Sequence, residues 1–277
     1  MGEAKIIKSA GLNGISGLEV IVETSISNGL PGFVIVGLPD NSVQESRERV
    51  RAVLKNIGFD FPMRRILVNL APADTRKAGP LYDLPIALGV LTASGQMDSA
   101  PENAVFVGEL SLDGELRPVK GVLPMALSAS AYGAKSIFVP KENAREASLA
   151  GNLAVYPVGH INEIIAHLRE ESGIAPAPPY AAEPVETENL DFADVRGQES
   201  VRRALEVAVS GAHNILLTGP AGSGKSMMAS RIPSILPQMT RQEMISATAI
   251  HSIAGLTCKS APLLRRPPFR SPHHTIS

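Results

Sequence analysis

The sequence contains no tryptophan, a single cysteine and few aromatic residues. Cys258 has no second cysteine to pair with, so no disulfide can form within the chain. Aromatic residues are 4% of the 277, which argues against the stacking surfaces of single-strand-binding folds but leaves contacts to phosphates open. No run of about 18 to 20 apolar residues is present, so neither a membrane-spanning helix nor a membrane partner is expected. The first residues contain no apolar signal core, which predicts a cytoplasmic protein.

The chain does have enough apolar sequence for one large domain or two ordinary ones, with 44% hydrophobic and 19% charged residues. Its charge is divided unevenly. Residues 1–191 carry 16 Lys and Arg against 23 Asp and Glu, whereas residues 192–277 carry 10 against 4. The basic part is therefore the candidate for binding polyanions.

An acidic, proline-rich stretch separates the two parts. From Glu171 to Asp191 the sequence holds four prolines and five acidic residues but no lysine or arginine. Such a stretch cannot bury enough apolar surface to offset the entropy of ordering it, so a semi-extended linker is expected. The expected organisation is a domain over residues 1–170, a linker over 171–190 and a second domain over 191–277.

The first part alternates the signals of strands and helices. Short β-branched runs bounded by glycine predict strands, and apolar residues at helical spacing predict helices. A capping-box pattern at Ser42 and Glu45 predicts the start of one helix and Gly58 its end, while Asp83 is predicted to cap another. Strands are expected at 18–26, 33–36, 65–70, 104–109 and 136–140, and helices at 42–57, 84–93, 123–131 and 161–169. The pattern predicts an α+β sandwich of a sheet and helices.

One motif dominates the second part, with an apolar run at 214–218 before it and a helical pattern at 227–232 behind it. The residues that match G-x-x-x-x-G-K-[ST] are Gly219-Pro220-Ala221-Gly222-Ser223-Gly224-Lys225-Ser226. The glycines let the backbone curl so that successive N–H groups point inward and form an anion site. Lys225 is expected to contact the β- and γ-phosphates of ATP, and the Ser226 hydroxyl to bind the Mg²⁺ that bridges them. The alternative is a glycine-rich turn that matches by chance; the expected strand and helix around the loop favour nucleotide binding.

The motif Gly219–Ser226 is a phosphate-binding loop (P-loop). Together with several other short sequence segments, it resembles the magnesium-chelatase-like AAA+ proteins of the ComM (YifB) competence type. These segments are Phe192-Ala193-Asp194-Val195-Arg196-Gly197-Gln198, Pro268-Phe269-Arg270-Ser271-Pro272-His273-His274-Thr275, Gly37-Leu38-Pro39-Asp40, Asn69-Leu70-Ala71-Pro72-Ala73-Asp74 and Tyr82-Asp83-Leu84-Pro85-Ile86-Ala87. The resemblance covers essentially the whole chain and implies an α/β protein. An N-terminal α+β domain with the fold of the Lon protease catalytic domain (ribosomal S5 domain 2-like) would precede the first part of a P-loop AAA+ domain. The resemblance also implies that Val195 and Gln198 lie near the adenine, mostly through backbone groups.

The resemblance to Lon raises the question of peptidase activity. Such proteases use a serine directly after a Gly-Pro pair, with a desolvated lysine as its base. In this sequence Leu81 follows Gly79-Pro80. Leu123 stands at the position of the lysine, and Lys120 is three residues away. Because both catalytic atoms are absent, no peptidase activity is expected, and the first domain is interpreted as an assembly or partner-binding scaffold.

Other polar residues favour ordinary roles. Spacings that match no zinc pattern favour surface or turn positions for His251, Cys258, His273 and His274. A basic run lies next to Phe269, for which a solvated face and contact with DNA phosphates are equally favoured: Lys259, Arg265, Arg266 and Arg270.

Two parts of a hydrolysing P-loop ATPase are not visible in the sequence. Hydrolysis needs an acidic residue after a later strand, to hold Mg²⁺ and position water, and ring-forming members need an arginine that reaches the neighbour's γ-phosphate. Glu243 is the only acidic residue after Ser226. The chain is therefore expected to bind ATP and Mg²⁺ but to hydrolyse ATP poorly, and to be the N-terminal portion of a longer family member. No catalytic residue is assigned.

By resemblance, the intact protein would be a hexameric, DNA-dependent ATPase that drives branch migration during DNA uptake and recombination. Two alternatives remain. One is the ATPase subunit of a magnesium chelatase, which inserts metal into a porphyrin but begins near its P-loop without a Lon-like domain. The other is a nucleotide-binding module that does not hydrolyse ATP.

Overall fold

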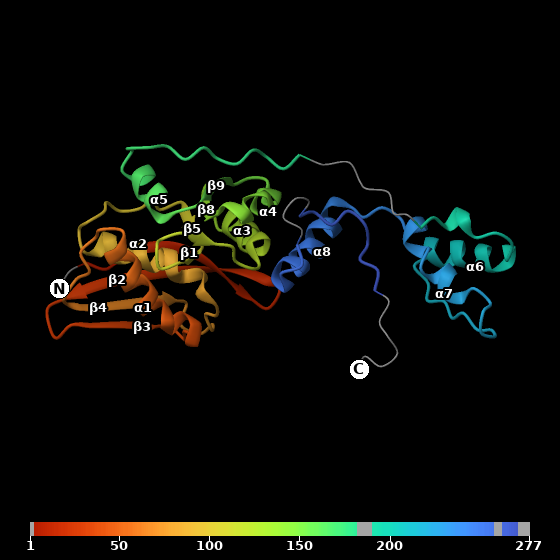
Figure 1. Cartoon of the computed structure of the whole chain (residues 1–277), viewed down its shortest axis with the longest axis horizontal. Coiled ribbons are helices and arrows are strands. Elements are labelled where there is room, and N and C mark those ends of the chain that lie inside the picture. Colours follow the sequence, from red (N-terminus) through yellow and green to blue (C-terminus); the bar gives the residue numbers. More distant parts are fainter. Residues whose placement is uncertain (1–2, 182–189, 258–261, 271–277) are drawn as a thin grey trace. The chain divides into compact units, whose positions relative to one another are not determined.

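The structure is a computed structural model that describes residues 3–181, 190–257 and 262–270 (Figure 1). The chain divides into two compact units. The first unit comprises Met1–Ala181 and Ala249–Pro262, and the second unit comprises Ala182–Thr248 and Leu263–Ser277.

A seven-stranded sheet forms the centre of the first unit. Its strands are β1 (Lys5–Asn13), β2 (Ser16–Ser27), β3 (Gly32–Val36), β4 (Arg65–Ala71), β5 (Ala104–Phe106), β8 (Ser136–Pro140) and β9 (Ala154–Val158). Their order is β3-β4-β2-β1-β5-β8-β9, in which β2 runs antiparallel to β1 and β4 and the other neighbours are parallel. Val22 pairs with Ile7 on one side and with Leu70 on the other, so buried apolar residues line up across the sheet. A separate hairpin consists of β6 (Glu109–Leu110) and β7 (Leu116–Arg117).

Helices lie on both faces of this sheet. They are α1 (Asn41–Asn56), α2 (Asp83–Ala93), α3 (Val122–Ala131), α4 (Ala144–Ala147) and α5 (Ile161–Leu168). Gly89 of α2 lies against Thr24, whereas Gly17 lies against Pro124 of α3. Because side chains alternate along a strand and Gly17 and Thr24 are an odd number of residues apart, α2 and α3 cover opposite faces of β2.

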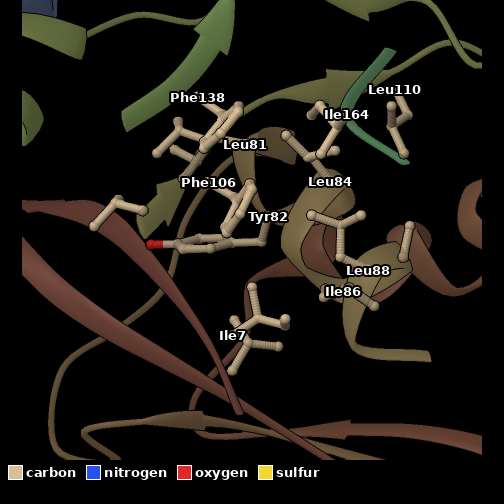
Figure 2. Packing of buried hydrophobic residues seen from close by; sticks show 14 of the residues in the cluster. Ile7, Leu81, Tyr82, Leu84, Ile86, Leu88, Phe106, Leu110, Phe138 and Ile164 are labelled. Atoms are coloured by element: carbon tan, nitrogen blue, oxygen red, sulfur yellow. The ribbon is translucent and has the colours of Figure 1, made fainter. Parts of the chain in front are cut away.

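The first unit has one continuous apolar core, through which α2 runs. Ten of the 11 residues of α2 are buried. Tyr82, just before this helix, is buried with Ile7 and Phe106 in the same cluster (Figure 2). The Tyr82 hydroxyl comes so close to Gly11 that any side chain there would collide with it, which is why β1 has a glycine at this point. The α+β arrangement expected for this part of the chain is confirmed.

Two predicted helix caps and one predicted strand differ from the structure. The cap of α1 is Asp40 and not Ser42: the Asp40 carboxylate accepts a hydrogen bond from Val43 N at 2.8 Å. Asp40 also accepts one from Gly79 N at 3.1 Å, so it fixes the loop before α2 as well. Asp83 is not a cap either, because it is the first residue of α2 and its carboxylate is held by an arginine. The strand expected over 104–109 is divided between β5 and β6.

The acidic, proline-rich segment begins on the outer edge of the sheet. Ala177 N donates a hydrogen bond to Val155 O of β9 at 2.7 Å, and Ile174 N donates one to His167 Nδ1 at 3.1 Å. Ile174 and Ala177 also pack against the apolar core. Residues up to Ala181 accordingly belong to the first unit.

The described residues of the second unit form a small core and three α-helices. These are α6 (Glu199–Ser210), α7 (Lys225–Ala229) and α8 (Arg241–Ala254), of which α8 belongs to the first unit from Ala249 on. The apolar core consists of Phe192, Val195, Leu205 and Met228. Helix α6 precedes the P-loop in the chain. The helix expected behind the P-loop starts two residues earlier than predicted and is short.

Candidate nucleotide-binding site

The loop from Gly219 to Ser226 leads into α7 and has the backbone conformation that its glycines allow. Gly222 and Gly224 have φ angles of 80° and 85°. This left-handed region is strained for residues with a Cβ, so glycine is required at both positions. A Cβ added to Gly222 would meet no atom within 4 Å, so the space over this part of the loop is open.

Lys225 ties the end of the loop to its beginning. Its ammonium group donates hydrogen bonds to Gly219 O at 2.9 Å and to Pro220 O at 2.7 Å. A third contact joins Lys225 Nζ to Ser223 Oγ at 3.2 Å. The positive charge of the lysine is therefore held inside the curl of the loop, where an anion would bind. The sequence motif gave no reason to single out Ser223 as a lysine partner, because that position of the motif accepts any residue.

The strand predicted at residues 214–218 is wrong. No strand is present among the described residues of the second unit. Ile215 is 40% exposed and Leu216 is 85% exposed. A strand needs a neighbouring strand to pair its backbone groups, whereas a helix pairs its own. The described residues of this unit supply no such neighbour, so the apolar run before the P-loop has no regular secondary structure and is mostly solvent-exposed.

The two residues expected near the adenine lie at the start of the second unit. Val195 is buried in the small core with Met228, which follows Lys225 by three residues. Gln198 is exposed with φ 55°, and its carbonyl accepts hydrogen bonds from the first turn of α6. The Val195 side chain is buried in the core and its backbone N–H donates to Phe192 O at 3.1 Å, so neither group is available to a ligand. A place for both residues beside the adenine remains a prediction.

The positions that would hold a Lon-type catalytic pair are apolar and buried. Leu81 is 6% exposed and Leu123 is 0% exposed. Leu81 packs in the main core, and Leu123 N donates a hydrogen bond to Glu146 Oε1 at 3.3 Å. Lys120 is exposed. Neither leucine can serve as a nucleophile or a base, so these two positions do not supply the Lon-type catalytic pair.

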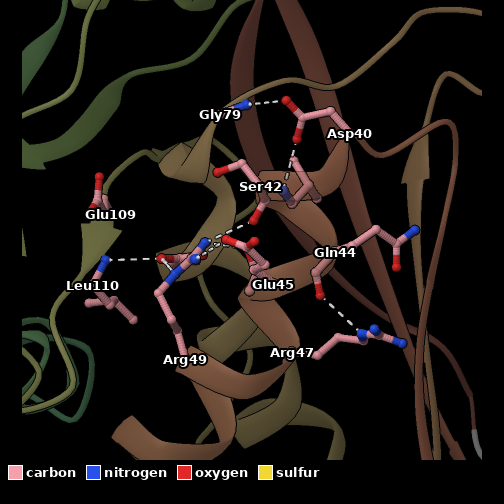
Figure 3. A network of polar contacts seen from close by, with 12 residues as sticks. Asp40, Ser42, Gln44, Glu45, Arg47, Arg49, Gly79, Glu109 and Leu110 are labelled. Atoms are coloured by element: carbon pink, nitrogen blue, oxygen red, sulfur yellow. Dashed lines mark hydrogen bonds and ion pairs between the residues drawn. The ribbon is translucent and has the colours of Figure 1, made fainter.

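A buried ion pair that the sequence did not reveal joins three elements of the first unit (Figure 3). Arg49 of α1 donates to both carboxylate oxygens of Asp83, at 2.8 and 3.0 Å. Leu110 N of β6 donates to the same carboxylate at 3.3 Å. Burial raises the pKa of Asp83, and the hydrogen bonds from Arg49 and Leu110 act in the opposite direction. The carboxylate is fully buried and surrounded by protein donors, so this network is structural.

The remaining sequence candidates are only partly within the described residues. His251 is half-buried on α8, and Arg270 is exposed. Arg265 and Arg266 are half-buried and take part in polar contacts. The candidates that lie outside the described residues are Cys258, Lys259, His273 and His274.

The described ranges contain neither a cluster of metal-binding side chains nor a helix that could cross a membrane. Over residues 3–181, 190–257 and 262–270, no group of three or more His, Cys, Asp or Glu side chains could hold a metal ion. In that same part of the chain, no helix combines the length and the apolar character that crossing a membrane requires.

The described residues combine a P-loop with an α+β unit in which leucines occupy the two positions of the Lon-type catalytic pair. Two protein-family models match the two parts of the chain. A family model described as "Subunit ChlI of Mg-chelatase" matches residues 22–143, and one described as "Magnesium chelatase, subunit ChlI" matches residues 191–277.

Similar curated proteins extend along nearly the whole chain. It is 44% identical over 270 residues to "Uncharacterized protein Rv2897c" of Mycobacterium tuberculosis and 39% identical over 281 residues to "Competence protein ComM" of Haemophilus influenzae. These matches cover 97% and 98% of this chain and 54% of each relative. "Uncharacterized protein YifB" of Escherichia coli is 39% identical over 98% of this chain and 53% of its own length.

The chain therefore belongs to the magnesium-chelatase-like proteins of the ComM/YifB family. It spans about half the length of the curated relatives it matches. The "Lon protease" of Rhizobium meliloti is 27% identical over 168 residues, which are 56% of this chain and 20% of that protein. The expected Lon-like fold is thereby confirmed.

Proposed function

We propose that the chain binds ATP together with Mg²⁺ in the loop Gly219–Ser226. The loop N–H groups surround the phosphates, Lys225 contacts the β- and γ-phosphates, and the Ser226 hydroxyl is a ligand of the Mg²⁺. The observation that carries this proposal is a loop with left-handed glycines, tied at its base by Lys225 and open above Gly222. Family membership supports it, because the loop lies within residues 191–277, which match the model described as "Magnesium chelatase, subunit ChlI".

Recognition through the phosphates predicts an order of affinities that can be measured by competition against a fluorescent ATP analogue. ATP and ADP with Mg²⁺ should bind, whereas AMP and adenosine should bind far more weakly, because they lack the phosphates that Lys225 contacts. Equal affinities for ATP and adenosine would exclude the loop as the binding site.

For the protein at the full length of its relatives, the proposed activity is that of a hexameric, DNA-dependent ATPase that promotes branch migration. Two observations support it: a relative that covers nearly the whole chain is named as a competence protein, and residues 192–277 carry 10 basic against 4 acidic residues. The test is ATP turnover by a full-length protein, with and without a four-way DNA junction. Turnover that DNA leaves unchanged would contradict this activity.

A magnesium chelatase subunit is the second candidate, supported by the names of the two matching family models. It is separated from the first by a reconstitution experiment. A magnesium chelatase reaction that lacks only its ATPase subunit should recover metal insertion into the porphyrin when the full-length protein is added, if this candidate is correct. The competence-type function predicts no recovery.

A further inference from the structure

The ammonium group of Lys225 has an acceptor for each of its donors. A lysine carries three N–H donors. Those of Lys225 contact Gly219 O at 2.9 Å, Pro220 O at 2.7 Å and Ser223 Oγ at 3.2 Å. The Ser223 hydroxyl in turn donates to Pro220 O at 2.9 Å. A phosphate oxygen can therefore reach Lys225 only if one of these acceptors is displaced.

The three acceptors differ in how much the loop would change if a phosphate oxygen replaced them on Lys225. The carbonyls of Gly219 and Pro220 belong to the backbone at the start of the loop, so their release would loosen the curl that binds the ligand. The Ser223 hydroxyl is on a side chain that turns about one bond, and its contact is the longest of the three. The hydroxyl of Ser223 is thus the acceptor that a ligand can replace with the least change in the loop.

We propose that Ser223 is a positioning residue whose hydroxyl takes the place of a phosphate oxygen on Lys225 while the loop is empty. A nucleotide must then compete with an acceptor of the protein itself, so Ser223 lowers the affinity for nucleoside di- and triphosphates. The inference rests on the proposed nucleotide binding and assigns a role to a motif position whose residue type the motif leaves open.

The test compares variants at Ser223 by calorimetric titration with Mg·ADP and Mg·ATP. Ser223→Ala should bind both about three- to tenfold more tightly, because a hydrogen bond to a charged donor no longer has to be exchanged. Ser223→Cys, whose thiol is a weak acceptor of similar shape, should shift the affinity in the same direction. Ser223→Thr keeps the hydroxyl and should bind like the starting protein.

Two control variants show whether Ser223→Ala changes the nucleotide affinity through Lys225 or through a general effect of removing a hydroxyl group. Ser210→Ala removes a hydroxyl that bonds only within α6, to Glu206 O at 2.7 Å, and should leave the affinity unchanged. In a Lys225→Met background, Ser223→Ala should have no further effect, because no ammonium remains to be released. A gain in affinity that persists in this background would overturn the inference.

The outcomes also separate this inference from the proposed function. If the starting protein binds nucleotide but Ser223→Ala and Ser223→Cys bind equally or more weakly, the role of Ser223 is wrong and nucleotide binding stands. If the folded starting protein and all its variants bind neither nucleotide, the proposed function fails and the inference fails with it.

Discussion

Arg49 is the side chain on which the polar core of the first unit depends. Arg49→Ala leaves the buried Asp83 carboxylate without its charged partner, so the free energy of unfolding in urea at pH 7 should fall by about 3 kcal/mol or more. Arg47→Ala is the matched control on the same helix, since Arg47 Nε bonds only to Gln44 O. Its effect should stay below about 0.5 kcal/mol.

The cost of Arg49→Ala should shrink as the pH falls. Burial raises the pKa of Asp83 and Arg49 opposes this, so removing Arg49 raises that pKa further. A carboxyl whose pKa is higher in the folded state than in the unfolded state destabilises the protein when it is ionised. This cost disappears as the pH falls through the folded pKa. A loss of stability that is the same at pH 5 as at pH 7, or that stays within the Arg47→Ala range, would contradict the role of the pair.

Single residues were predictable from the sequence where their constraint is local. The left-handed conformations of Gly222 and Gly224 follow from the spacing of the P-loop motif itself. The ion-pair role of Asp83 was not predicted, and the residue was interpreted as a helix cap. Its partner Arg49 lies 34 positions away in the sequence, and no local sequence pattern identifies such a distant partner. The cap of α1, in contrast, was within reach of the sequence, because the bond from Val43 N to Asp40 is local and aspartate is a preferred cap.

At the scale of elements, helices were easier to predict than strands. The helices α1, α2, α3 and α5 satisfy their own backbone groups, so the spacing of their apolar residues is enough to place them, although the caps predicted at Ser42 and Asp83 were wrong. The strands β1 and β9 were not predicted, because their membership of the sheet depends on pairing with distant segments. For the same reason the apolar run at 214–218 gave a strand signal although the described residues offer it no neighbour.

The exposed run before the P-loop should tolerate polar substitution in this chain. Leu216→Ser should change the hydrogen-exchange protection of α6 by less than about 0.5 kcal/mol, because the side chain is already 85% exposed. Leu205→Ser, the same change in the buried core of the second unit, should cost about 2 kcal/mol or more. Equal losses for the two variants would show that Leu216 is buried in solution.

Limited digestion with a glutamate-specific protease tests where the first unit ends. Residues up to Ala177 are held on the sheet, so the first cuts should follow Glu183, Glu186 or Glu188 in the acidic, proline-rich segment. The fragment that ends there should keep the circular dichroism of a folded α+β domain. Cuts that appear earlier within residues 1–170, for example after Glu109, would contradict this boundary.

At the scale of the whole molecule, ATP hydrolysis requires residues that ATP binding does not. Glu243, the only acidic residue after the P-loop, receives hydrogen bonds from Thr240 N at 2.7 Å and Thr240 Oγ1 at 2.8 Å at the start of α8. A carboxylate engaged as a helix cap does not position an attacking water. The 277-residue chain should therefore hydrolyse ATP only at a residual rate, because a missing arginine alone typically costs about 10³- to 10⁵-fold.

Phosphate release measured with and without DNA checks this expectation. The comparison is a protein of the full family length under the same conditions, which should turn over ATP faster. Robust, DNA-stimulated turnover by the 277-residue chain itself would mean that its own residues, for example the basic ones near Arg265, supply the charge that hydrolysis needs.

The most direct test of nucleotide binding by the P-loop is a calorimetric titration of the chain and of Lys225→Ala with Mg·ATP. Lys225 ties the loop together through Gly219 O and Pro220 O, and in the proposed function it supplies the charge that meets the phosphates. The chain should bind Mg·ATP, and Lys225→Ala should bind it at least about tenfold more weakly, since a hydrogen bond to a charged group contributes about 1.5 to 3 kcal/mol. Equal affinities for the two folded proteins, or no binding by the starting chain, would contradict the account.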